Sequence, residues 1–399
     1  MRNPFSQWTR NWLLLLGAVF STGIFFGVQL TLYNNFIVER LHIEAQQLGF
    51  VEGLRELPGF LNALFIALLI RIAPPLVGAA ALVVMGLGIM AYSQLSSVFM
   101  LAVYSLVWSL GFHCWAPLEQ TLGLAYSPPG DKGRWLGQMR SASSLAWLLA
   151  IGACMLLYPL LHYGGLFVMA GAATVVGGLA LLLTDRRRTT IVERGLVFRR
   201  RYLLFYVLQA LQGCRKQVFI TFAIFALVKV HGMPVQTAML LSLVNQGFVF
   251  LTGPLMGRLV DRLGERVTLS VSHFVLIFVF LGYAFVEDRT TLYVLYCVDS
   301  GIFFGAIALT TYLHKIAPAE DVKPTLAMGV TMNHLSSVVA PIAGGFVWHY
   351  FGYQVIFVSG AVLSLVSLIA SQRVDPAGLL AREARLAADG AQAVAPAAT

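Results

Sequence analysis

Charged residues are scarce in this sequence. Only 11% of its 399 residues are Asp, Glu, Lys or Arg, whereas a soluble domain carries about 25%. Hydrophobic residues make up 58% of the chain, and the mean hydropathy is +0.78. These values exclude an ordinary soluble domain and predict a polytopic membrane protein.

Cysteines and nucleotide-binding motifs are also scarce. The four cysteines all lie inside apolar runs, without the spacing of a metal or redox motif. No G-x-x-x-x-G-K-[ST] phosphate loop is present, and no polar segment is long enough to form a domain that hydrolyses ATP. We therefore expect no cofactor, no metal site and no enzymatic activity, and any transport must be secondary.

Long apolar runs fill most of the chain instead. Twelve of them reach the length of about 20 residues that crosses a bilayer, and they separate at charges and at Pro or Gly clusters. They predict helices at 12–38, 47–71, 75–94, 97–126, 134–160, 164–184, 202–230, 235–257, 267–286, 290–314, 324–350 and 353–372.

A basic segment divides these helices into two groups of six. We expect an N-terminal bundle at 1–184, a basic cytoplasmic linker at 185–201 and a C-terminal bundle at 202–373. An Ala-rich tail at 374–399 is expected to be mobile.

Lys and Arg are unevenly distributed between the two sides of the predicted bundle. With both termini in the cytoplasm, 20 of the 27 lie on the cytoplasmic side and only Arg40, Lys229 and Arg289 lie on the other. Because cytoplasmic loops accumulate these residues, we expect both termini in the cytoplasm and the protein in the inner (plasma) membrane. This placement accounts for the net charge of +9, so we expect membrane lipid and not nucleic acid as a partner. We expect the protein to be a monomer.

The two halves of the sequence repeat. At an offset of 190 to 192 residues, Gly23 aligns with Gly213 and Tyr104 with Tyr296. The constant spacing of such matches, rather than any single one, indicates an internal duplication. Two parallel six-helix repeats predict a solute site between the halves, near the middle of the membrane.

One charged stretch between two apolar runs has a recognisable pattern. It resembles the loop motif G-x-L-x-D-R-x-G-x-R of the major facilitator superfamily, and the matching residues are Gly257, Leu259, Asp261, Arg262, Gly264 and Arg266. With the twelve helices, the repeat and the basic linker, the resemblance covers residues 12–372. It implies an all-α integral membrane protein with twelve transmembrane helices in two pseudo-symmetric six-helix bundles, which work by alternating access.

The sequence departs from the superfamily pattern in two places. The first-half copy of the loop has Arg71 where the aspartate is expected. The helix at 134–160 lacks the G-P-x-x-G-G run of drug/proton antiporters, and a similar run, Pro341 to Gly345, occurs in the helix at 324–350 instead. The subfamily is therefore not assigned, and import and export both stay open.

The resemblance also implies a gate at the cytoplasmic loop, formed by Gly257, Asp261, Arg262, Gly264 and Arg266. Asp261 is expected to contact the positive N-terminus of the helix at 134–160, near Gly133 and Arg134.

Arg262 is expected to form an ion pair with an acidic residue, either Glu320 or Asp321. Glu119 and Arg140, near the cytoplasmic ends of their helices, are expected to form a second gate pair. The alternative, which carries equal weight, is that this pair has a purely structural role.

Eight charged residues lie inside predicted helices: Glu52, Arg55, Glu56, Glu119, Arg140, Arg215, Lys216 and Asp299. Such a charge costs about 2.5–3.5 kcal/mol on insertion scales, so these residues should face the bundle interior. Glu52, Arg55 and Glu56 share one helix face through their i, i+3, i+4 spacing. We interpret both glutamates as candidates for proton coupling; the alternative is a structural cluster neutralised by Arg55.

Arg215 and Lys216 are two adjacent cations with no local acid. Their partner is either Asp299, for one of the two, or an anionic or zwitterionic solute. The predicted cavity residues are Arg55, Gln212, Arg215, Lys216, Asn245, Gln246, Asp299 and Asn333. His113 and His334 are interpreted as core residues in preference to proton relays.

We therefore expect a secondary active transporter that moves a small organic solute by alternating access, with coupling to protons. The alternative is a non-transporting receptor or lipid-handling protein with the same fold.

Overall fold

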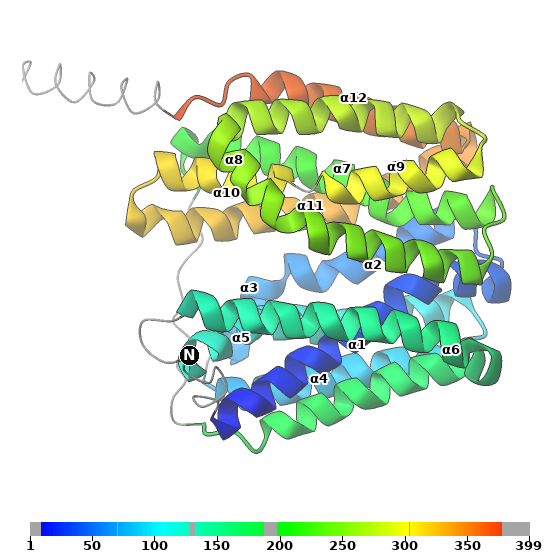
Figure 1. Ribbon diagram of the computed structural model, residues 1–399, viewed down its shortest axis with the longest axis vertical. Helices are drawn as coiled ribbons and strands as arrows, with labels where there is room; N and C mark the ends of the chain where they lie inside the picture. Colours follow the sequence, from blue (N-terminus) through cyan, green and yellow to red (C-terminus); the bar gives the residue numbers. More distant parts are fainter. Residues whose placement is uncertain (1–8, 70, 128–131, 187–197, 303, 377–399) are drawn as a thin grey trace, which may run out of the picture.

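The computed structural model describes residues 9–69, 71–127, 132–186, 198–302 and 304–376 (Figure 1). Within these ranges every regular element is a helix. The α-helices are α1 Arg10–Leu41, α2 Ala45–Phe60, α3 Asn62–Leu69, α4 Pro74–Met90, α5 Val98–Tyr126, α6 Lys132–Leu181, α7 Leu203–Lys229, α8 Val235–Phe285, α9 Arg289–Gly301, α10 Phe304–Ile316, α11 Ala319–Phe351 and α12 Tyr353–Ser371. Two short 3₁₀ turns, Ala91–Gln94 and Arg200–Tyr202, complete the order.

Short polar side chains start several of these helices. The hydroxyl of Ser97 accepts a hydrogen bond from the Met100 amide at 3.2 Å before α5. The carboxylate of Asp288 does the same for the Thr291 amide at 2.7 Å before α9. Each cap satisfies an amide that the first helical turn leaves without a partner.

The two longest helices each reverse direction at one residue. In α6 the reversal is at His162, with φ 48° and ψ −164°, and in α8 it is at Gly264, with φ 76° and ψ 167°. Figure 1 shows the two legs of each helix running in opposite directions. Gly264 belongs to the charged loop motif, and a glycine adopts this positive φ without steric cost.

Two predicted helices are broken in the structure, so their prediction as continuous helices is wrong. The helix predicted at 47–71 divides at Leu61 into α2 and α3. Pro58 lies just before the break, and its ring excludes one helical hydrogen bond. The helix predicted at 290–314 divides after Gly301 into α9 and α10.

With the legs of α6 and α8 counted separately, and α2–α3 and α9–α10 each counted as one, the helices match the twelve predicted segments in order. Among the described helices, eight are individually long and apolar enough to cross a membrane. The number of twelve crossings therefore stays a prediction. Most of the predicted linker and tail, at 187–197 and 377–399, lies outside the described residues.

The helices form two groups that follow the order of the chain. In Figure 1 helices α1 to α6, coloured from blue to green, lie below helices α7 to α12, coloured from green to red. Gly23 on α1 lies against Ser143 on α6, whereas its repeat partner Gly213 on α7 lies against Asn333 and Ser336 on α11. Equivalent glycines thus permit equivalent close helix contacts in the two halves. The exact domain bounds stay a prediction.

The two groups meet most closely along α2 and α11, near the end of the bundle away from the chain termini. Gly49 on α2 lies against the Pro341 carbonyl and Gly345 on α11. Because neither glycine carries a side chain, the two backbones approach directly.

Polar contacts close the same end of the interface. The Asn35 side chain donates to the Met233 carbonyl at 2.8 Å. The Lys229 ammonium donates to the Glu44 carboxylate at 2.8 Å and to the Ile43 carbonyl at 3.1 Å. These bonds join the α1–α2 connection to the α7–α8 connection.

We predict that Gly49→Ala destabilises the folded protein by about 1–3 kcal/mol, the usual cost of overpacking, because the added methyl group would collide with the Pro341 carbonyl. The measurement is the thermal unfolding midpoint in detergent micelles. Gly152→Ala is the matched control, since nothing lies within 4 Å of its added methyl group. Equal midpoints for the two variants would contradict the interface packing.

Candidate functional site

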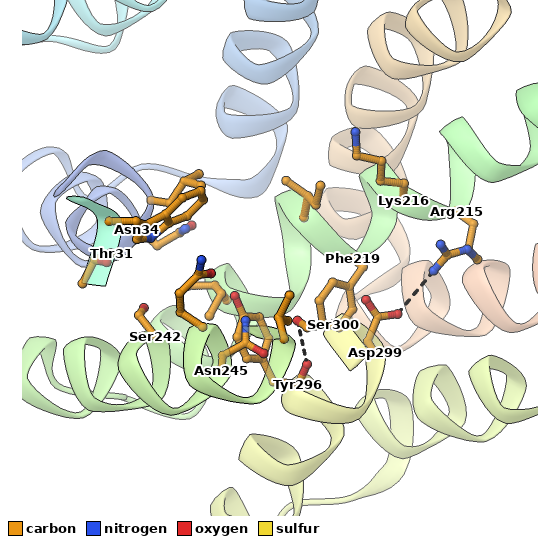
Figure 2. Close-up of a pocket in the computed structure, with 16 residues that line it drawn as sticks. Thr31, Asn34, Arg215, Lys216, Phe219, Ser242, Asn245, Tyr296, Asp299 and Ser300 are labelled. Carbon is orange, nitrogen blue, oxygen red and sulfur yellow. Dashed lines mark hydrogen bonds and ion pairs between the residues drawn. The ribbon is translucent and has the colours of Figure 1, made fainter. Parts of the chain in front are cut away.

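A cavity of about 330 Å³ lies between the two groups of helices (Figure 2). Its wall comes from α1, α6, α7, α8 and α9, so both halves contribute. The polar residues that line it are Thr31, Asn34, Arg215, Lys216, Ser242, Asn245, Gln246, Asp299 and Ser300. Of the predicted cavity residues, the structure brings Arg215, Lys216, Asn245, Gln246 and Asp299 together here.

Aromatic rings form the apolar part of the wall. Phe219 on α7 and Tyr296 on α9 stack with ring centroids 5.3 Å apart and an interplanar angle of 18°. Trp147 on α6 also lines the cavity, on the side of the other half. Flat rings beside amide and hydroxyl groups suit a small solute with a planar portion and a polar portion.

Arg215 forms an internal ion pair. Its Nη1 atom lies 3.3 Å from Oδ1 of Asp299, and both side chains are 10% exposed. This dashed contact in Figure 2 joins α7 to α9 within the C-terminal half. Of the two alternatives left by the sequence, the structure selects the internal partner for this cation.

Lys216 is the cation that remains. It lines the same cavity, and within the described part of the chain its ammonium makes no hydrogen bond or ion pair. Figure 2 shows its side chain directed away from the Arg215–Asp299 pair. Asn34 and Asn245 each have a buried side-chain oxygen that also lacks a partner among the described residues. Buried polar groups are rarely left unpaired, so the cavity is suited to a polar ligand or ordered water.

Arg55 lies between the two glutamates of its own helix face. Its Nη2 atom is 2.7 Å from Oε2 of Glu52 and 3.1 Å from Oε1 of Glu56. The guanidinium carbon also lies 5.6 Å from the centre of the Trp108 ring. Arg55 therefore compensates both carboxylates, as the structural alternative expects.

Glu56 has a second partner that Glu52 lacks. Its Oε2 atom lies 3.3 Å from Nδ1 of His334 on α11, in the opposite half. Among the described residues, it is the only carboxylate in the middle of the bundle that forms an ion pair or hydrogen bond across the two halves.

A small pocket of about 20 Å³ adjoins Glu52. Its lining includes Gln29, Tyr33 and Asn34 on α1, and Asn34 also lines the large cavity. The amide oxygen and nitrogen of Gln29 are buried and lack partners among the described residues, whereas the Tyr33 hydroxyl interacts with the Glu52 carboxylate. A space of this size holds one water molecule.

Sequence reasoning missed Gln29, Asn34 and Ser242 as site residues. The signal was present, because each is a polar side chain inside a predicted membrane helix. Two predicted cavity residues, Gln212 and Asn333, do not line the cavity. The Asn333 amide donates instead to the Gln209 carbonyl at 3.4 Å.

Arg55 lines the small pocket and not the large cavity.

The predicted gate contacts are not formed in this conformation. Asp261 and Arg262 are exposed, and neither has an ion-pair partner within the described ranges. Asp321 is not available to Arg262, because it accepts a hydrogen bond from the Tyr202 hydroxyl and pairs with Arg199, each at 2.8 Å.

The other predicted gate residues form no ion pair with one another among the described residues. Glu119 is partly buried and Arg140 is exposed, and no ion pair joins these two described residues. Arg266 is exposed and contacts Gln372 at 3.5 Å. Gly264 forms the reversal in α8, and Gly257 lies in the helix just before it.

The sequence matches the family described as Major Facilitator Superfamily over residues 14–323. The chain belongs to this superfamily. The predicted all-α membrane fold of two related bundles is thereby confirmed, and the protein is a multi-pass membrane protein with a transporter fold. No protein with a curated description matches the sequence.

Solved structures of three superfamily-type transporters resemble this chain. The nucleoside transporter NupG aligns with a TM-score of 0.76 and 15% identity, over 92% of this chain and 99% of that chain. A bacterial homolog of the human lysosomal transporter Spinster, inward-facing and unoccupied, gives 0.72 and 13%, over 91% and 96%. A POT family transporter with a thioalcohol-conjugated peptide gives 0.73 and 10%, over 92% and 96%. These likenesses show the fold.

We predict that Asp299→Asn destabilises this superfamily member, because removing one partner of a buried ion pair leaves an uncompensated charge and costs about 3–5 kcal/mol. The thermal unfolding midpoint in detergent measures the effect. The double variant Arg215→Gln with Asp299→Asn should recover part of the loss, since neither charge then remains. A double variant that is less stable than the single one would contradict the pairing.

Proposed function

We propose that the protein is a secondary active transporter, which moves a small organic solute across the membrane by alternating access. The observation that carries the proposal is the cavity between the two halves, with Lys216 unpaired in its wall. Transporters with internal repeats bind solute at such an interface, near the middle of the membrane.

The conformation of the interface supports a rocking motion. Between described residues, the polar contacts that join the halves lie at the end away from the chain termini and, through Glu56 and His334, in the middle. At the other end, the loop-motif residues Asp261 and Arg262 are exposed. With cytoplasmic termini, this arrangement is inward-facing, and the gate would form when the cytoplasmic side closes.

The cavity chemistry favours an anionic or zwitterionic solute with a planar group. Lys216 offers a positive charge, and Phe219 and Tyr296 offer a flat apolar surface. The unpaired amide oxygens of Asn34 and Asn245 can accept hydrogen bonds from donor groups of the solute. The similar structures include a nucleoside transporter and a peptide-bound transporter. Nucleotides and short peptides are therefore suitable first probes, whereas import and export are equally compatible with this site.

Protons are the coupling ion that we propose, with Glu56 as the carrier. Arg55 and His334 contact different oxygens of Glu56, and they belong to opposite halves. When the halves rock apart at this level, Glu56 loses one of its two cationic or hydrogen-bonding partners. A buried carboxylate that loses such a partner binds a proton more readily, so the two states differ in proton affinity, as coupling requires.

We predict that Lys216→Gln weakens binding of anionic probes about tenfold, since a hydrogen bond to a charged group contributes about 1.5–3 kcal/mol. A thermal-shift panel of nucleosides, nucleoside monophosphates, dipeptides and dicarboxylates first identifies the probes that bind. Their affinities are then measured for both forms of the protein. Lys323→Gln, which removes an exposed lysine, is the control. Unchanged affinities in Lys216→Gln would exclude the charge preference.

We predict that Glu56→Gln abolishes proton-driven accumulation of a bound probe in proteoliposomes but retains exchange of internal for external probe, because only the proton carrier is removed. Substrate uptake and a pH-sensitive dye measure the two quantities. Glu287→Gln, at an exposed position, is the control. Retained proton coupling would exclude Glu56 as the carrier.

Measurements of probe binding and of flux with the wild-type protein distinguish the two proposed functions. Specific binding of a probe without any flux would favour the non-transporting receptor or lipid-handling alternative.

A further inference from the structure

Glu56, His113 and His334 form a cluster of potential metal ligands where the two halves meet. Their ligand atoms all lie within 4.8 Å of one another. The three residues come from α2, α5 and α11, and none of the three side chains is more than 22% exposed. The proposed proton coupling uses Glu56 and its contact with His334, and it leaves His113 without a role.

The hydrogen bonds of His113 leave one ring nitrogen available to a metal. Its Nδ1 atom lies 2.9 Å from the carbonyl oxygen of Ser109, which can only accept, so Nδ1 carries the proton. The Ser109 hydroxyl donates to the Arg55 carbonyl oxygen, which fixes it in turn. Nε2 of a neutral His113 therefore keeps its lone pair. A histidine that binds a metal is commonly oriented in this way, through a hydrogen bond from its other nitrogen to a backbone carbonyl.

Gly59 shows that the two imidazoles point toward the same place. A methyl group added at Gly59 would lie 2.5 Å from Nε2 of His113 and 2.6 Å from Nδ1 of His334. The absence of a side chain at Gly59 thus keeps the space in front of both nitrogens free of protein atoms from α2.

Glu56 keeps one carboxylate oxygen that Arg55 does not contact. Arg55 contacts Oε1 of Glu56, whereas Oε2 faces His334. The charge of Arg55 is shared with Glu52, at 2.7 Å. Lys216 is a further cation whose charge acts on Glu56. One carboxylate oxygen and two imidazole nitrogens remain for the ion, and the two nearby cations oppose its binding.

We propose that Glu56, His113 and His334 bind a divalent transition-metal cation of the zinc class. Two histidines and one carboxylate are a ligand set that zinc accepts, with metal–ligand distances of about 2.0–2.2 Å and a fourth position left for water. Reaching those distances requires the three side chains to contract around the ion. Coordination by Nδ1 of His334 requires the proton of its neutral ring to lie on Nε2, so the hydrogen bond from Nδ1 to Glu56 is replaced by the metal–ligand bond.

The bound ion ties the two halves together. His113 and Glu56 belong to the N-terminal half and His334 to the C-terminal half, so rocking would have to break a metal–ligand bond. The ion also occupies the Oε2 atom of Glu56. Inhibition of transport by zinc follows from this geometry and rests on the proposed function, whereas zinc binding itself does not.

The test is a calorimetric titration of the metal-free, full-length protein in detergent with zinc chloride. We expect one zinc ion per chain. His113→Ala and His334→Ala should each weaken binding by at least roughly tenfold. Gly59→Ala should weaken it as well, because it fills the space without removing a ligand. His349→Ala removes an exposed histidine from the end of the same helix, α11, and should bind as the wild type does.

Absence of zinc binding by the wild type would overturn the site, and so would His113→Ala and His334→Ala variants that bind zinc as tightly as the wild type does. The unfolding midpoint of each metal-free variant shows whether it is folded. If a histidine variant does not fold, the zinc affinities of Gly59→Ala and Glu56→Gln test the site instead. Zinc binding that follows this pattern in a protein without any solute flux would leave the metal site standing and reject the proposed transport.

Discussion

The cost of an unpaired charge in a low-dielectric interior governs the middle of this protein. Arg55 is held between Glu52 and Glu56, and Arg215 is held by Asp299. These pairings fix the inward faces of α2, α7 and α9, and they place the polar part of the bundle at the boundary between its halves. Lys216 lines the cavity and makes no hydrogen bond or close ion pair within the described residues, although its charge acts on Glu56. Its position gives the cavity an electrostatic preference that the paired residues cannot give.

Close helix packing within each half allows that half to move as a rigid body. Gly23 and Gly213 occupy equivalent places in the repeat and bring equivalent helices into contact. At the interface between the halves, small residues at Gly49 and Gly345 have a different consequence, since they close one end of the bundle. The two uses of glycine differ in what must happen during a transport cycle. Contacts within a half persist, whereas contacts between α2 and α11 are the ones that rocking would loosen.

Glu56 connects the charge cluster of one half with the other half through His334. That position makes it the proposed proton carrier, and it also explains why the same residue belongs to a cluster of metal ligands. Both roles need a carboxylate oxygen that can exchange one partner for another. They exclude each other at any moment, because a proton and a metal ion would compete for that oxygen. A transporter coupled through such a residue would be sensitive to the metal content of its surroundings.

The sequence by itself determined the class of the protein, since apolar runs, basic loops, the repeat and the motif from Gly257 to Arg266 are all local or periodic signals. It also placed Glu52, Arg55 and Glu56 on one face, because helical geometry fixes neighbours three and four residues apart. Only the tertiary structure decided that Arg215 pairs with Asp299, and that His113 meets His334. These partners lie on different helices, far apart along the chain. Their distances depend on how the helices pack, which the spacing of residues in a single sequence does not specify.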